Sequence, residues 1–448
     1  MPGPADRSVN APQLPGGQPH GPSSSHRTGA TPRLPLGRLL LLLFAGISLL
    51  AGLDAALVRL GGVAPVSSVT LGSVHGILMI YGFLGTAICL ERAVAIGRDA
   101  GTGASRNSQH QLGRGRLWAY AAPLLSGLAG AVTIILASFP AVERALVQLP
   151  IPRYLGVHLG GFQAARLLPG LLWTGALAML VAIYVHVWRK RQKSSAVLIQ
   201  GLGAVIGLVG VLLWDRGLEI PAMMPWWLMF LVVTIIGERL ELARLGFLSG
   251  STEQRITTEV CLLIFALILS LVVPIYGYPL LGITLGVLAA DVAWHDVARK
   301  TIRIPGVPRF AAAAMLMGYA WAMVPTILWV IHPPVFDGYA YDAIVHAVTI
   351  GFILSMVMAH APVIIPAVAR RDVPYHPVMW IPLVFLEVGL LLRLLAGARE
   401  ADGLWRLGGS LSVVAVLVFV ASTLTLTILG ARRNKAEKTR SATTGVTP

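Results

Sequence analysis

The stretch from Asp342 to Val368 reads DAIVHAVTIGFILSMVMAHAPVIIPAV, an apolar run long enough to cross a bilayer that carries His346 and His360. The two histidines are 14 residues apart, close to four turns of an α-helix. A regular helix would therefore place them on nearly the same stripe, separated by about 21 Å along the axis. Ionisable side chains are costly inside a membrane span, so these histidines indicate a functional site.

The rest of the chain has the composition of a membrane protein. Hydrophobic residues make up 56% of the sequence and charged residues only 12%, and the mean hydropathy is +0.74. Apolar runs of about 20 residues recur, and they are continuous rather than alternating, which favours helices over a β-barrel. We predict an all-α, polytopic membrane protein whose main partner is the lipid bilayer. The net charge of +15 falls in short loops, so nucleic acid is not an expected partner.

The apolar runs predict twelve spans, and the basic residues predict their orientation. The spans are 35–58, 68–91, 117–138, 167–188, 196–214, 225–245, 258–276, 278–297, 311–331, 341–368, 378–397 and 405–430. This segmentation places 27 of the 35 basic residues on one side. The positive-inside rule then predicts both termini in the cytoplasm. We expect the chain in the plasma (inner) membrane. Residues 1–33 are expected to form a disordered cytoplasmic tail, 34–431 the transmembrane domain and 432–448 a basic cytoplasmic tail.

The orientation fixes the depth of the intramembrane histidines. His75 in the second span and His346 in the tenth both lie near the outer surface, whereas His360 lies deeper, toward the cytoplasmic third. Imidazole is the commonest metal ligand, and two facing imidazoles can hold a haem iron from both sides. Arg393 and Arg399, at the outer end of the eleventh span, could then pair with haem propionates. The alternatives are a hydrogen bond to a neighbouring helix for each histidine and snorkelling for the arginines.

Two segments resemble known haem proteins. HGILMIY, from His75 to Tyr81, resembles the second-helix motif of haem-copper oxidase subunit I, in which a histidine ligates the low-spin haem. YDAIVHAVTIGFILSM resembles that family's tenth helix, and twelve spans in three arcs match its fold. HAVTIGFILSMVMAH is closer still to the NnrS family, related membrane proteins linked to nitrogen-oxide metabolism. The resemblance implies haem, with the b type as a guess, and His75 and His346 as axial ligands, with His360 as a third candidate.

The sequence also departs from these families. The oxidase tenth helix has a second histidine two residues after the first, and Val348 stands there in this chain. The sixth span, PWWLMFLVVTIIGERL, has no histidine, and no His-His pair occurs near spans seven and eight. Copper and oxygen reduction are therefore not expected, and no catalytic residue is predicted. The NnrS segment usually continues into a Gly-His-Thr-Gly stretch, where this chain has HAPVIIPAV.

Two other classes remain open at this point. A cofactor-free permease would use the histidines with Asp54 or Glu387 as a proton or substrate path, and it predicts inverted repeats and broken helices. Prolines 274, 325 and 362 permit such breaks. In a structural or assembly subunit the histidines would only pack. The sequence identifies no redox partner.

Overall fold

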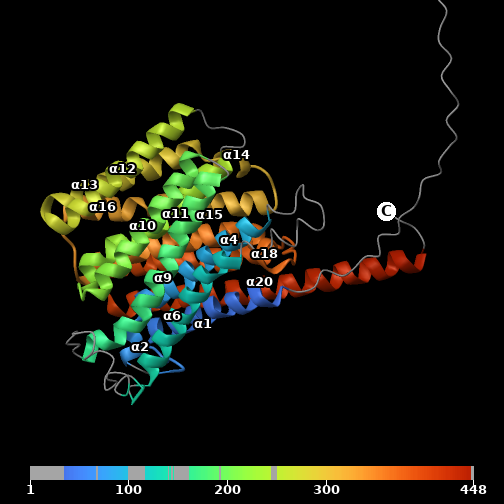
Figure 1. Ribbon diagram of the computed structural model, residues 1–448, viewed down its shortest axis with the longest axis horizontal. Coiled ribbons are helices and arrows are strands. Elements are labelled where there is room, and N and C mark those ends of the chain that lie inside the picture. Colours follow the sequence, from blue (N-terminus) through green and yellow to red (C-terminus); the bar gives the residue numbers. More distant parts are fainter. Residues whose placement is uncertain are drawn as a thin grey trace, which may run out of the picture. The chain divides into compact units, whose positions relative to one another are not determined.

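The computed structural model describes residues 35–66, 69–98, 117–139, 141, 142, 145, 161–190, 193–243 and 250–444. All regular structure within these ranges is helical, and twelve helices are long and apolar enough to cross a membrane (Figure 1). This confirms the prediction of an all-α, polytopic membrane protein. Helices prevail because lipid offers no partner for backbone N–H and C=O groups, which a helix satisfies within itself. The predicted N-terminal tail, residues 1–33, lies outside the described residues.

The helices follow one another along the chain with short connections. They are α1 (Leu36–Arg59), α2 (Val69–Ser73), α3 (His75–Ile77), η1 (Leu78–Gly85), α4 (Thr86–Arg98), η2 (Leu117–Tyr120), α6 (Ala121–Ser138), α9 (Gly161–Lys190), α10 (Ser195–Asp215), α11 (Ile220–Ala243), α12 (Gly250–Val272), α13 (Pro274–His295), α14 (Ala298–Thr301), α15 (Val307–Trp321), α16 (Met323–Ile331), α17 (Gly338–His346), η3 (Ala347–Leu354), α18 (Ser355–Ala369), η4 (Pro377–Met379), α19 (Trp380–Gly397) and α20 (Asp402–Thr444).

Among the described spans, the third and eleventh begin with a short 3-10 helix, and three others are interrupted along their length. The second span consists of α3, η1 and α4, and the tenth of α17, η3 and α18; η1 and η3 are π-helical segments of eight residues each. The ninth span breaks between α15 and α16 at Ala322, where Pro325 removes the backbone donor to residue 321. Pro274 only starts α13, and Pro362 lies inside α18 without ending it. The last helix runs on to Thr444, beyond the predicted end of the transmembrane domain at 431.

The sixth and second spans form the centre of the bundle. The most apolar window of α11 is 83% buried and that of the second span 67%, more than in any other candidate span of the described residues. Tyr81 of η1 stacks on Phe230 of α11, with ring centroids 5.6 Å apart. Glycines of α10 allow this packing: a Cβ at Gly210 would lie 2.7 Å from the Tyr81 hydroxyl. Small residues let helices approach closely where lipid supplies no hydrophobic driving force.

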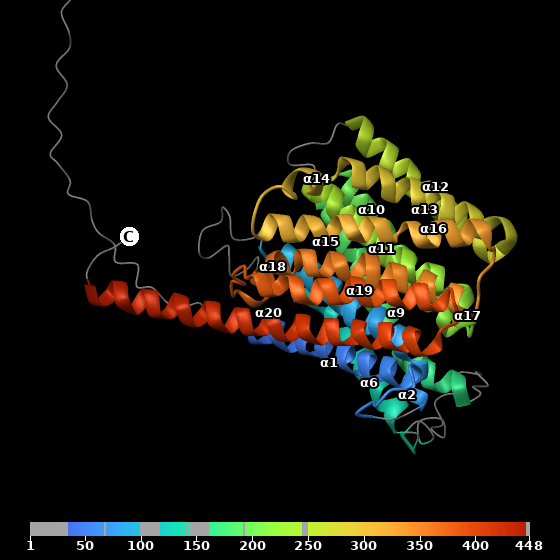
Figure 2. The same cartoon turned by 180° about the vertical axis from the view of Figure 1, so that it is seen from behind.

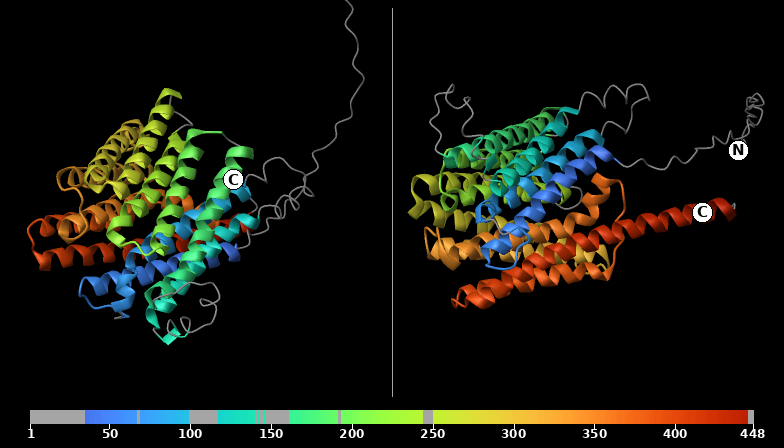
Figure 3. Two further views of the ribbon diagram at one scale, coloured as in Figure 1. Left: turned by 60° about the vertical axis from the view of Figure 1, so that its left-hand side comes forward. Right: turned by 90° about the horizontal axis from the view of Figure 1, so that it is seen from below.

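Segments distant in sequence enclose one end of the bundle. The first helix, α1, contacts η1 and also α20, and these two terminal helices lie side by side in Figure 2. η3 contacts both α11 and α19, and α17 contacts α19. Figure 3 shows the arrangement from two further directions, with α12 and α13 (yellow) packed against each other. Spans one, two, six, ten, eleven and twelve therefore meet around a common space.

Candidate functional site

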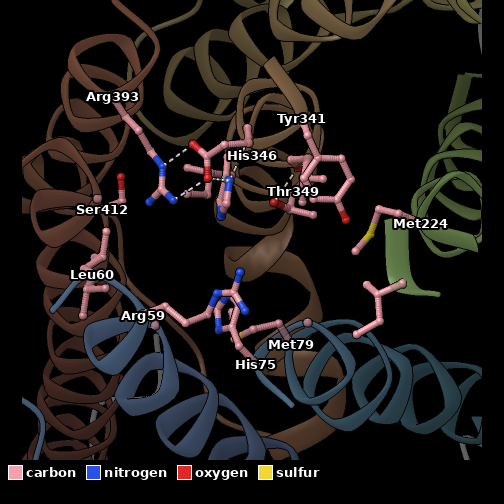
Figure 4. Close-up of a pocket in the computed structure, with 18 of the residues that line it drawn as sticks. Arg59, Leu60, His75, Met79, Met224, Tyr341, His346, Thr349, Arg393 and Ser412 are labelled. Atoms are coloured by element: carbon pink, nitrogen blue, oxygen red, sulfur yellow. Dashed lines mark hydrogen bonds and ion pairs between the residues drawn. The ribbon is translucent and has the colours of Figure 1, made fainter. Parts of the chain in front are cut away.

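A cavity of about 720 Å³ lies where these six spans meet, and we call it the histidine cavity (Figure 4). Its deeper wall is apolar and includes Leu53, Ile80, Leu84, Leu354 and Val416. The polar side chains gather toward the helix ends at which Arg59, Ile220 and Gly338 stand. Its volume is typical of a ligand or cofactor site, and so is an apolar wall with a few polar groups.

His75 stands at the first position of α3 and lines the cavity. Its Nδ1 lies 2.8 Å from the carbonyl oxygen of Gly52 in α1. A carbonyl only accepts, so Nδ1 carries the hydrogen and Nε2 keeps its lone pair. A Cβ at position 52 would lie 2.6 Å from Sδ of Met79, so the glycine leaves room for that side chain beside α1.

His346 ends α17 and faces His75 across the cavity in Figure 4. Its Nδ1 lies 2.8 Å from the Asp342 carbonyl oxygen and 3.1 Å from the Asp342 carboxylate. Both acceptors place the hydrogen on Nδ1, as in His75. No hydrogen bond from the described residues reaches Nε2 of either ring. With the hydrogen on Nδ1, the neutral tautomer of each ring presents an open Nε2 to one cavity, which is the form that binds a metal centre.

Both histidines precede a π-helical segment. η1 begins three residues after His75, and η3 begins directly after His346. Single π turns are frequent at functional sites, because each takes in an extra residue and rotates the following side chains by about 100°. η3 therefore interrupts the regular helix on which His346 and His360 would share a stripe. His346 lines the cavity, and His360 is not among its lining residues.

Asp342 and Arg393 form an ion pair beside His346. Arg393 donates from Nε to Oδ2 at 2.8 Å and from Nη2 to Oδ1 at 2.7 Å. The Trp405 indole donates to Oδ2 at 2.9 Å and its ring lies under the Arg393 guanidinium. Spans ten, eleven and twelve are thus joined at the cavity. Arg393 was predicted to pair with a ligand carboxylate, and its partner here is the carboxylate of Asp342.

Arg59 is a cavity residue that the sequence analysis missed. It ends α1, lines the cavity and lies beside His75 in Figure 4. Within the described ranges it has no ion-pair partner, so it is the cation available to an anionic group in the cavity. Arg399, which was predicted for this role, is exposed and does not line the cavity. Asp342 was also missed, although its place four residues before His346 puts it on the same helical face.

A second polar cluster lies at the opposite ends of these helices, and we call it the arginine network. Its members are Arg92, Gln200, Glu238, Arg239, Glu241, Asp296, Tyr319 and His360. Arg92 pairs with Glu238 at 2.9 Å and Glu241 at 3.2 Å. Arg239 donates two hydrogen bonds to Asp296, at 2.6 and 2.9 Å. These contacts join spans two, five, six, nine and ten and the segment after span eight.

His360 belongs to this network. Its Nδ1 donates to the Met356 carbonyl at 2.6 Å, and its Nε2 accepts from Arg239 at 3.1 Å. Both ring nitrogens are therefore occupied, unlike those of His75 and His346. His332 is exposed at the end of α16 and is not a cavity residue. His158 lies outside the described residues.

Asp296 lies just beyond the eighth span, and its environment favours the charged form. Burial by itself would raise its pKa, but the hydrogen bonds and charge of Arg239 outweigh that effect. The Ala298 amide and the Tyr319 hydroxyl add hydrogen bonds to the carboxylate. The pKa of Asp296 is consequently lower than that of an ordinary aspartate.

Within the described part of the chain, no three His, Cys, Asp or Glu side chains come together as a metal-ion site. His75 and His346 could thus hold a metal only with a ligand that brings its own donors. The fold and the cavity define a class: a multi-pass α-helical membrane protein with two open imidazoles in a cavity at one end of the bundle. The chain belongs to the family described as a domain of unknown function (DUF8744), whose model matches residues 38–428. No curated protein matches this sequence.

Proposed function

We propose that this protein binds haem, of the b type, in the histidine cavity, with His75 and His346 as the two axial ligands. The observation that carries the proposal is the pair of Nε2 atoms that face one cavity while both Nδ1 atoms are held by acceptors. This ligand state suits a low-spin haem, because a neutral imidazole offers one lone pair to the iron.

The remaining features of the cavity fit a porphyrin. Its volume of about 720 Å³ suits a cofactor, and its deeper wall is apolar like the macrocycle. Arg59, at the polar end, is placed to pair with a propionate, while Asp342 occupies Arg393. A porphyrin brings four nitrogen donors, which explains how two protein ligands suffice. When bound, the haem would supply one-electron chemistry.

The proposal extends to the setting of the site. The resemblance to haem-copper oxidase subunit I and to the NnrS family supports a bundle of that type, with a role in electron transfer or nitrogen-oxide metabolism. We place the histidine cavity toward the outside and both termini in the cytoplasm of a plasma (inner) membrane, because of the distribution of basic residues. We do not propose oxygen reduction, since Val348 replaces the second histidine of the oxidase motif.

Haem content tests the proposal. A pyridine haemochrome assay on the detergent-purified protein, expressed with haem supplied, should give close to one haem per chain. His332→Ala, which alters a histidine outside the cavity, should keep that ratio. Loss of haem from His332→Ala would instead indicate a different ligand set.

A cofactor-free permease is the second candidate. The observation that favours it is the position of the histidine cavity, which occupies one end of the bundle while the arginine network joins the helices at the other. The break between α15 and α16 is also of the kind that transporters use. If the protein is a permease, it would fold without haem and still bind its substrate.

A further inference from the structure

The two imidazoles of the histidine cavity have different supports. Nδ1 of His75 donates only to a backbone carbonyl, that of Gly52. Nδ1 of His346 meets a backbone carbonyl and also, at 3.1 Å, the carboxylate of Asp342. Only His346 has an anionic acceptor on the nitrogen that faces away from the cavity.

A carboxylate on the far nitrogen of an imidazole makes the near nitrogen a stronger electron donor. It draws the Nδ1 hydrogen toward itself and fixes the ring orientation. Stronger donation stabilises the oxidised form of a bound iron and lowers its midpoint potential.

Arg393 limits this effect. Its two hydrogen bonds take up both oxygens of Asp342, and the Trp405 indole adds a third. Arg393 is only 8% exposed, so little water screens its charge. The carboxylate is therefore shared between a buried guanidinium and the His346 ring.

We propose that Asp342 is a positioning residue that makes His346 the stronger donor of the two axial ligands and thereby lowers the midpoint potential of the bound haem. Arg393 sets the size of that decrease. The proposal rests on the proposed function and deepens it. It assigns unequal roles to His75 and His346, and it gives the Asp342–Arg393 pair a purpose beyond joining three helices.

The test compares four variants of the full-length, haem-loaded protein by redox titration and by EPR of the ferric low-spin state. Asp342→Asn should raise the midpoint potential and shift the EPR g-values, which respond to donation from the axial imidazoles. Arg393→Gln should lower the potential, because it removes the buried positive charge and leaves the carboxylate to His346 and the Trp405 indole. Asp342→Asn combined with Arg393→Gln leaves no unpaired buried cation, and it should keep the shifted g-values even if the single variant folds poorly.

Asp402→Asn is the matched control. Asp402 lines the same cavity and bonds to the Tyr339 hydroxyl, not to an imidazole. Its removal changes the charge by the same amount and should shift the potential less, with unchanged g-values. The proposal would be overturned if Asp342→Asn showed the g-values of wild type, or if its midpoint potential equalled that of Asp402→Asn.

Haem content separates failure of this proposal from failure of the proposed function. Wild type without haem overturns the function, and this inference with it. If wild type and Arg393→Gln bind haem and neither variant that carries Asp342→Asn does, the inference is overturned and the proposed function is not. Such a result would make Asp342 a requirement for assembling the site and not a group that tunes it.

Discussion

Intramembrane histidines in the histidine cavity and in the arginine network differ in how many of their ring nitrogens are hydrogen-bonded. At the cavity, His75 and His346 use one ring nitrogen each and leave the other open. In the network, His360 uses both, one toward a carbonyl and one toward Arg239. We therefore propose a ligand role only for the two histidines that leave one ring nitrogen without a partner among the described residues.

Removing either proposed haem ligand should have the largest effect. We expect His75→Ala and His346→Ala each to lose nearly all bound haem, because a single imidazole cannot replace the two-sided ligation. The measurement is haem per chain in protein that elutes as a folded peak in detergent. Full haem in either variant would remove that residue from the site.

Breaking the buried ion pair of the network should cost stability and not haem. Asp296→Ala leaves the Arg239 charge buried without its carboxylate, which costs about 3–5 kcal/mol. Asp291→Ala is the matched control, since Arg255 bonds Asp291 with the same two-contact geometry but is exposed, and its loss should be smaller. Thermal unfolding in detergent measures both. Equal losses would contradict the contrast between buried and exposed pairs.

His360→Ala should behave as a structural change. It leaves one Arg239 donor without its acceptor, which costs about 1–3 kcal/mol. Haem per chain should stay at the wild-type value in the folded fraction. Stoichiometric loss of haem from a folded His360→Ala protein would make His360 a ligand after all.

The twelve spans were predictable because lipid forces each apolar run to be a helix, whatever its neighbours are. The pairing of His75 with His346 was predictable from their matched depth. The different depths of His346 and His360 were predictable too. The change of helix rotation between them was not, because no residue in η3 signals a π turn. The place of Arg59 beside His75 depends on which helices adjoin, and the sequence of one helix does not carry that information. Asp342 was within reach of the sequence, because it lies four residues before His346 on the same helical face.

Arg59 and Arg399 can be compared as candidate partners of a haem propionate. Arg59→Gln should weaken haem retention about fivefold, the size of an exposed ion pair, because it removes the available cation of the cavity. Arg399→Gln should have no effect, since that side chain does not line the cavity. Haem transfer to excess apomyoglobin measures both. The reverse order would favour the arginine predicted from sequence.

The smallest effect concerns pH at the network. The pKa of Asp296 is lowered in the folded protein, so its contribution to stability is full above about pH 4, the ordinary aspartate value. It is lost as the pH falls through the folded-state pKa. We expect the unfolding temperature to drop below pH 4 by more in wild type than in Asp296→Asn. Parallel curves for the two proteins would contradict this assignment.

The most direct test of the account is an optical spectrum of the purified wild-type protein, oxidised and then reduced with dithionite. Two imidazole ligands predict a Soret band and, on reduction, sharp α and β bands of a low-spin haem, at close to one haem per chain. Folded protein with no Soret band, after expression with haem supplied, would contradict the account. The open nitrogens of His75 and His346 would then belong to a substrate or proton path.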